Sequence, residues 1–158
     1  MPPMKNFAMT LALVLSVASM LGLHGCYSKS TDEGGNPIVG TWLVKDSAAP
    51  FPYHMYVFNA DGTLQQANPD AGDPRTSDSD GKGVWISNGD RIKCKWMEIV
   101  ADRTTHKFSG RLEISCDIQV SIDTFTGTET VSVFDANGAL TEGPTNPTLL
   151  EGKRVTLR

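Results

Sequence analysis

Apolar and polar residues alternate over much of this chain, in short runs separated by turn-forming residues. The clearest run is residues 111–121, where every second residue is apolar or cysteine and the residues between are charged, amide or hydroxyl side chains. A period of two is typical of a β-strand with one face in a core and the other in water. The body of the chain shows no sustained helical period, so the pattern predicts an all-β protein.

Turn dipeptides join these runs into hairpins: Asp61-Gly62, Asn88-Gly89 and Asn137-Gly138. Asp-Gly and Asn-Gly between β-type runs favour tight turns. A succession of such hairpins predicts a single antiparallel up-and-down β-barrel of about eight strands. We expect it to occupy residues 38–158.

Each hairpin also fixes which residues oppose each other, and opposed residues share a face of the sheet. If a turn forms at Asn88-Gly89 and the next hairpin is centred on Thr105, two cysteines face each other on the inside. They would form either a disulfide or two buried free thiols. The expected inward pairs are Trp85 with Ile92, Cys94 with Cys116, Trp96 with Ile114, and Phe125 with Val120.

The same register turns two carboxyl groups, Glu98 and Glu129, toward the barrel interior. A buried carboxylate is costly unless it is paired or protonated. The alternative is a β-bulge near Met97 or Gly127, which would return these groups to water. Polar groups inside an apolar barrel are typical of a ligand site.

The first hairpin supplies further lumen candidates, because a turn at Gly62 places His54, Tyr56 and Phe58 on the inner face. Together with Trp85, Trp96, Glu98 and Glu129 they form the expected ligand-binding set. An imidazole near Glu98 would permit acid–base chemistry. The simpler reading of a histidine among aromatic residues is a core or rim position.

A Gly-x-Trp triplet opens the first strand, at Gly40-Thr41-Trp42, and the chain ends in a basic strand that contains Arg154. A guanidinium there would stack over the indole and close one end of the barrel. This pairing resembles the calycins, the lipocalin-like and avidin-like barrels. Phe51–Phe58 and Asp61–Pro69 resemble stretches of uncharacterised bacterial lipocalin-like proteins, a likeness that implies no particular activity.

The N-terminus reads as an export signal, with Lys5 before an apolar run from Phe7 to Leu23. Leu23-His24-Gly25-Cys26 resembles the lipobox of bacterial lipoproteins. This implies a signal peptide over residues 1–25, a lipid on Cys26 and a flexible tether over residues 26–37. Tyr27 follows the cysteine, and the absence of Asp at that position resembles lipoproteins sorted to the outer membrane of Gram-negative bacteria. The alternatives are an uncleaved anchor and an ordinary signal peptide of a secreted protein.

Cysteine number and charge agree with an exported single domain. Of three cysteines, lipid on Cys26 leaves Cys94 and Cys116 as an even pair. The chain carries 14 Lys and Arg against 18 Asp and Glu, a net charge of −4. Such a mildly acidic surface argues against nucleic acid as a partner, which needs basic patches. We expect a monomer.

The polar loop over residues 68–82 contains Asp70, Asp73, Asp78 and Asp80 and partly resembles a calcium-binding loop. Thr76 stands at the first ligand position, and no glutamate follows at the last one, so a solvated loop or a lid is expected and no metal. The chain also has no paired-histidine motif, nucleophile elbow, CxxC or phosphate-binding glycine loop. No cofactor is expected.

Three functions fit these features. The first is a lipid-anchored barrel, facing the periplasm, that binds a small apolar or amphipathic molecule in its lumen. The second is a structural, interaction or inhibitor module with a filled barrel. The third is a small-barrel isomerase, cyclase or hydrolase that uses an inward glutamate with His54; we expect a non-enzyme.

Overall fold

The computed structural model describes residues 35–69 and 73–157, and these residues form ten β-strands. The strands are β1 (Gly40–Asp46), β2 (Tyr53–Phe58), β3 (Thr63–Ala67), β4 (Thr76–Asp78), β5 (Gly81–Asn88), β6 (Arg91–Asp102), β7 (Phe108–Val120), β8 (Thr124–Asp135), β9 (Leu140–Glu142) and β10 (Thr148–Arg154).

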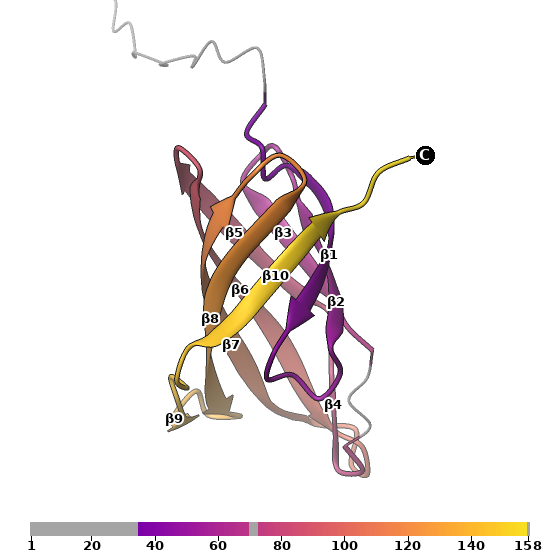
Figure 1. The fold of residues 1–158 in the computed structure, drawn as a ribbon. Coiled ribbons are helices and arrows are strands. Elements are labelled where there is room, and N and C mark those ends of the chain that lie inside the picture. The colour runs from indigo at the N-terminus through magenta and orange to yellow at the C-terminus, as the bar shows by residue number, and fades with distance from the viewer. Residues whose placement is uncertain (1–34, 70–72, 158) are drawn as a thin grey trace, which may run out of the picture. The chain divides into compact units, whose positions relative to one another are not determined.

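Eight of these strands close into an antiparallel barrel, in the order β10-β1-β2-β3-β5-β6-β7-β8. Closure comes from β10, which pairs with β1 on one side and with β8 on the other (Figure 1). The short β4 and β9 are not part of this ring. β4 pairs with the end of β6, and β9 pairs with the end of β8. The prediction of an eight-stranded up-and-down barrel is confirmed.

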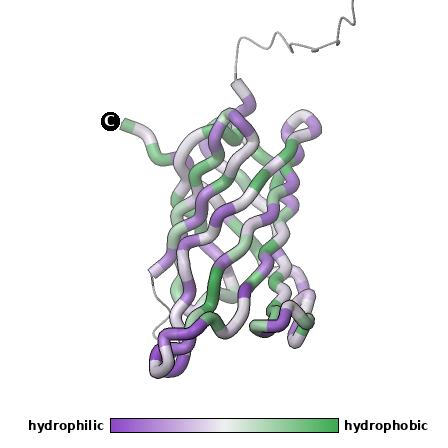
Figure 2. The backbone as a smooth tube through the Cα atoms, turned by 180° about the vertical axis from the view of Figure 1, so that it is seen from behind, coloured by the Kyte–Doolittle hydropathy of each residue, from purple (hydrophilic) through white to green (hydrophobic). Residues whose placement is uncertain are grey.

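Apolar and polar positions alternate along the barrel strands (Figure 2). In β6, Ile92, Cys94, Trp96 and Glu98 are buried while the lysines between them are exposed. β7 follows the same rule, with Ile114, Cys116, Ile118 and Val120 buried. Period-two patterning therefore sets the inner face of each long strand, as the sequence predicts.

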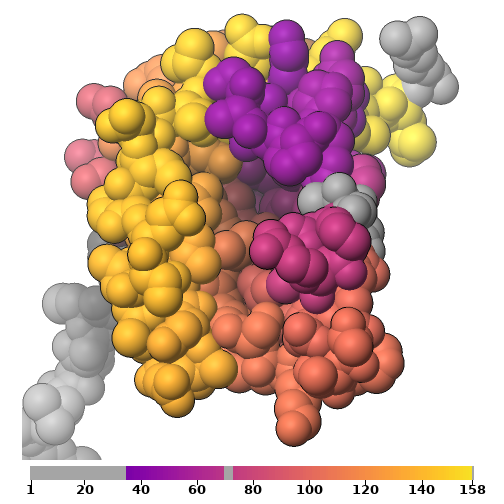
Figure 3. All heavy atoms as spheres, turned by 90° about the horizontal axis from the view of Figure 1, so that it is seen from below, coloured from indigo at the N-terminus to yellow at the C-terminus, as the bar shows by residue number. Residues whose placement is uncertain are grey.

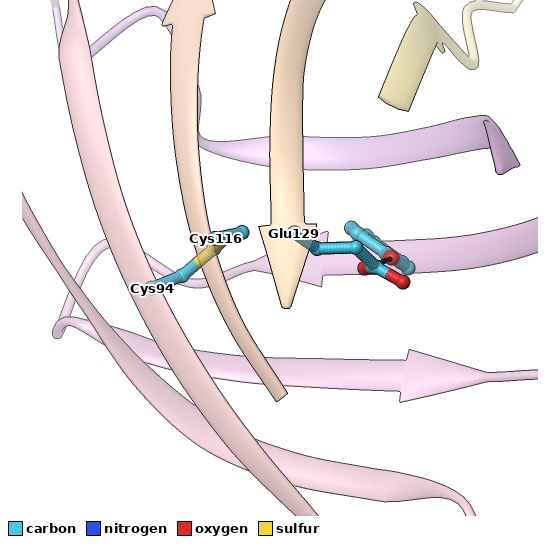
Figure 4. Close-up of a disulfide and its surroundings, with 4 residues drawn as sticks. Cys94, Cys116 and Glu129 are labelled. Carbon is cyan, nitrogen blue, oxygen red and sulfur yellow. Dashed lines mark hydrogen bonds between the residues drawn. A yellow bond between two sulfur atoms is a disulfide. The ribbon is translucent and has the colours of Figure 1, made fainter. Parts of the chain in front are cut away.

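The expected register is confirmed between β6 and β7, where Cys94 pairs with Cys116 and Trp96 with Ile114. It is also confirmed between β7 and β8, where Val120 pairs with Phe125. The two cysteines form a disulfide, with their Cα atoms 5.1 Å apart (Figure 4).

One predicted pairing is wrong. Trp85 lies opposite Cys94, not Ile92, because Asn88 pairs with Arg91 and the turn falls one residue later. Gly89 then takes the first turn position, with φ of 64°. A positive φ at that position gives a turn whose twist matches the strands. The slip is by two residues, so Trp85 keeps its inward face.

The suggested β-bulges near Met97 and Gly127 are not present. The register of β6 shifts only between Val100 and Ala101, beyond Glu98. Glu98 and Glu129 therefore stay on the inner face, and both are buried.

Trp42 closes one end of the barrel. Its indole N–H donates to the carbonyl of Ile38 at 2.8 Å, and the Arg154 guanidinium lies 4.3 Å above the ring centroid. Arg154 in turn donates to the carbonyl oxygens of Val39 and Ile122, at 2.8 and 2.9 Å. Phe125 also packs against Trp42, with ring centroids 5.2 Å apart.

The expected signal peptide, the expected lipid attachment site Cys26 and most of the expected tether lie outside the described residues. Within residues 35–69 and 73–157, no helix has the length and apolar character needed to cross a membrane.

Candidate functional site

A cavity of about 930 Å³ opens at the end of the barrel opposite Trp42. The molecular surface is hollowed at this end (Figure 3). The walls of the cavity come from the segment between β1 and β2, from the loop around β4, and from the ends of β6, β7 and β8 that lie nearest the opening. The size falls in the range usual for small-molecule sites.

Aromatic rings and Ile114 form the inner part of this cavity. The Tyr56 and Trp96 rings meet edge to face, with centroids 5.1 Å apart, and Glu129 lies with them among the lining residues. Phe58 and Trp85 are buried but do not line the cavity. They pack on each other, with centroids 6.2 Å apart, so the barrel is filled at one end and hollow at the other.

Glu129 projects from β8 into the cavity (Figure 4). The Tyr56 hydroxyl donates to its Oε2 at 3.3 Å. Burial raises the pKa of Glu129 to about 8, and a hydrogen bond with the Asp46 carboxyl adds to the effect. Burial and the nearby Glu129 also raise the pKa of Tyr56 well above its usual value. Glu129 is therefore protonated at neutral pH in the unliganded protein.

Glu98 lies on β6, two residues beyond Trp96 and on the same face. The Trp96 indole N–H donates to its Oε1 at 3.1 Å. Burial raises the pKa of Glu98 to about 7; the indole hydrogen bond opposes this, and the charges of Asp78 and Asp80 add to it. A carboxyl with such a pKa changes its protonation readily when a charge enters the cavity.

Gln66 fixes the tautomer of His54. Its Oε1 accepts from the Gly81 N–H at 3.0 Å, so its Nε2 is the group that donates to Asn68 Oδ1 at 2.8 Å and faces His54 Nδ1 at 3.2 Å. His54 Nδ1 then accepts, and the ring proton sits on Nε2. Among the described residues this buried N–H has no hydrogen-bond partner. Burial lowers the pKa of His54, which keeps the ring neutral.

Charge around the cavity is one-sided. Arg75 is the single Lys or Arg among the described lining residues, and its exposed guanidinium lies 3.6 Å from the Asp73 carboxylate. Six acidic residues line the same cavity: Asp46, Asp73, Asp78, Glu98, Glu129 and Glu142.

Comparisons with known proteins add nothing to this picture. No protein-family model, curated protein or solved structure matches the chain. What the site does must therefore follow from its geometry.

Several acidic residues lie near the mouth of the cavity. In the parts of the chain that the structure describes, no group of three or more His, Cys, Asp or Glu side chains is placed to hold a metal ion. Asp73 accepts from the backbone N–H groups of Arg75 and Thr76, at 2.7 and 3.2 Å, which orders the loop before β4. Asp70, one of the four aspartates in the loop that partly resembles a calcium-binding loop, lies outside the described residues.

Most of the expected lumen set meets in the cavity: His54, Tyr56, Trp96, Glu98 and Glu129. Two site residues, Asp46 and Gln66, were missed as candidates. The sequence contained a sign of each. Asp46 lies four residues after Trp42 in the same alternating pattern of β1, so both side chains face inward. Gln66 pairs with Tyr56 in the first hairpin, so it also faces inward. The enzyme hypothesis pairs His54 with an inward glutamate, but the side chain that meets the His54 ring at hydrogen-bond distance is Gln66, at 3.2 Å.

Proposed function

We propose that this chain is an exported binding protein that holds a small, partly apolar molecule in the open half of its barrel. The observation that carries the proposal is the half-filled interior: one end is packed solid around Trp42, while the other encloses a cavity with an aromatic inner wall. Apolar walls with a few buried polar groups are characteristic of small-molecule sites, since the former supply affinity and the latter orientation.

A filled barrel acting only as an interaction module fits less well. Such a barrel would gain stability from side chains packed through its whole length. Here Glu98, Glu129 and His54 take inward positions where apolar residues would be cheaper. Polar residues kept at inward positions are better explained by a ligand than by stability.

Native mass spectrometry of the protein, exported to an oxidising periplasm, tests this function. We expect an added mass of a few hundred daltons that is lost on extraction with organic solvent. The same spectrum reports the disulfide as the loss of two hydrogens. A bare protein mass, together with no ligand-dependent change in tryptophan fluorescence, would contradict the proposal.

The proposal includes a membrane anchor at Cys26 and a location on the periplasmic side of the outer membrane. Metabolic labelling with radioactive palmitate tests it. We expect the wild-type chain to be labelled and Cys26→Ser to be unlabelled, with Cys94→Ser as the matched control that keeps the label. An unlabelled wild-type chain would contradict the anchor and leave the barrel proposal in place.

A further inference from the structure

Three buried carboxyl groups gather at the cavity without a cationic partner. Asp46, Glu98 and Glu129 are 7%, 5% and 6% exposed. None of them forms an ion pair with a Lys or Arg among the described residues, whose ion pairs involve other acids. A buried acid without a cation is costly to the fold, whether it is charged or must hold a proton.

Aromatic faces lie beside two of these acids. Trp96 donates its N–H to Glu98, and Tyr56 donates its hydroxyl to Glu129, while the two rings touch each other. A cation at this position would meet carboxylate oxygens and aromatic rings together. Both attract positive charge, and the attraction is stronger where water is excluded.

His54 gives an independent sign of an absent ligand. The ring is nine-tenths buried and lines the same cavity, and its Nε2 has no hydrogen-bond partner of normal geometry among the described residues, although the backbone of Phe51 lies close enough to raise the pKa of the ring. An unsatisfied buried donor destabilises the fold, so such groups usually have a partner in the functional state. A ligand oxygen would satisfy it.

Building on the proposed function, we propose that the cavity takes an amphipathic organic cation: a primary or secondary ammonium on an apolar body that also carries an oxygen acceptor. The ammonium lies between Glu98 and Glu129 against the Tyr56–Trp96 pair, and the oxygen accepts from His54. The apolar body fills the rest of the cavity against Ile114 and the aliphatic ends of β7 and β8.

Binding of a cation must release protons. Near pH 6 both Glu98 and Glu129 are protonated in the unliganded site, because their pKa values are about 7 and about 8. An ammonium that enters favours the carboxylate forms, so protons leave to solvent as it binds. The titratable groups that face these acids are Asp46 on β1, Tyr56 on β2 and, near Glu98, Asp78 and Asp80, and His54 on β2 lines the same cavity. The proton release that is measured therefore belongs to the site as a whole.

Isothermal titration calorimetry with three matched probes tests the assignment: 2-(1-naphthyl)ethylamine, 2-(1-naphthyl)ethanol and 1-naphthylacetate. The three share an apolar body and differ in charge, and only the alcohol and the acetate carry an oxygen that can accept from His54, so a preference for the amine reports the cation alone. The exported protein is titrated near pH 6 in two buffers of different ionisation enthalpy. The blank is a titration of each probe into the same detergent solution without protein. We expect the amine to bind at least about tenfold more tightly than the alcohol, equivalent to about 1.4 kcal/mol, and the acetate not to bind. Only the amine should release protons.

Two variants test whether Glu98 and Glu129 cause the preference for the amine. In Glu98→Gln and Glu129→Gln we expect the ratio of amine to alcohol affinity to fall several-fold. The matched control is Glu113→Gln, on the outer face of β7, where Glu113 pairs with Lys95 and Arg111. Its ratio should equal that of the wild-type protein.

The failure of this assignment is distinguishable from the failure of the proposed function. An alcohol that binds as tightly as the amine, or a preference that survives both substitutions, overturns the cation while small-molecule binding stands. If no probe binds and the native mass carries an adduct without a basic nitrogen, the cation is again overturned. If no probe binds and the native mass is bare, both proposals fall together.

Discussion

Glu129→Gln isolates the effect of burying one carboxyl group on the stability of this barrel. The amide has nearly the same shape as the carboxylic acid, and its oxygen can accept from the Tyr56 hydroxyl as Glu129 does, at 3.3 Å in the wild type. Its NH₂ group can donate to Asp46, with which Glu129 also shares a hydrogen bond. The substitution therefore keeps the contacts and removes the ionisation.

The size and sign of the effect follow from proton linkage. The pKa of Glu129 rises from 4.5 in the unfolded chain to about 8 in the fold. Between these values the folded state holds a proton that the unfolded state has lost, so stability falls as the pH rises. It is fully present below pH ~4.5, and the loss is complete above pH ~8. At about 1.36 kcal/mol for each unit of pKa, the loss totals about 5 kcal/mol.

Urea denaturation followed by tryptophan fluorescence, at several values between about pH 5 and pH 9, measures this loss. Near pH 5 we expect the wild-type protein and Glu129→Gln to agree within about 1 kcal/mol. Near pH 9 the variant should be more stable by several kcal/mol. Glu98 titrates in both proteins, and because its charge helps to raise the pKa of Glu129, the difference between the two curves includes the coupling between the two acids.

Glu113→Gln provides the control for this series. Lys95 and Arg111 lower the pKa of Glu113, so its charge does not change above pH ~5. Its stability curve should run parallel to that of the wild-type protein throughout. If the Glu129→Gln curve is also parallel to the wild-type curve from pH ~5 to pH ~9, Glu129 is not held as a neutral buried acid, and the reasoning is refuted.

Three further changes test the barrel itself. Cys94→Ser with Cys116→Ser opens a loop of sequence separation 22, and we expect urea denaturation to show a loss of about 3 kcal/mol that reductant does not increase. Arg154→Met removes hydrogen bonds that close the barrel, so unfolding free energy should fall by about 1–3 kcal/mol while ligand affinity is kept. Gly83→Ala places a Cβ 2.0 Å from a carbonyl oxygen of β6, and we expect a loss above ~2 kcal/mol; Gly35→Ala, with open space around it, should cost little.

Hairpin parity explains why several contacts in the interior were predictable. In an antiparallel pair, one turn fixes every later pairing, and a shift by two residues leaves the inward face unchanged. Cys94 therefore meets Cys116, and Glu98 and Glu129 face inward, even though the turn before β6 falls one residue later than expected. The sequence did not predict Asp46 as a cavity residue, because a lone acid at the end of a strand is usually at the surface.

The sequence by itself determined the strands, their inward faces and the pairing of Cys94 with Cys116, because period-two patterning and turn chemistry act between neighbours in the chain. That the two cysteines form a disulfide and not two free thiols came from the structure. Only the tertiary structure decided that the barrel is packed at the Trp42 end and hollow at the other. Whether an end of the barrel is filled depends on the closure of the ring by β10 and on which inward side chains lie at the same height in the barrel. Closure also brings Tyr56 to Glu129 across a sequence separation of 73. Burial at such a meeting point then sets the pKa of the carboxyl groups, a property that no local pattern contains.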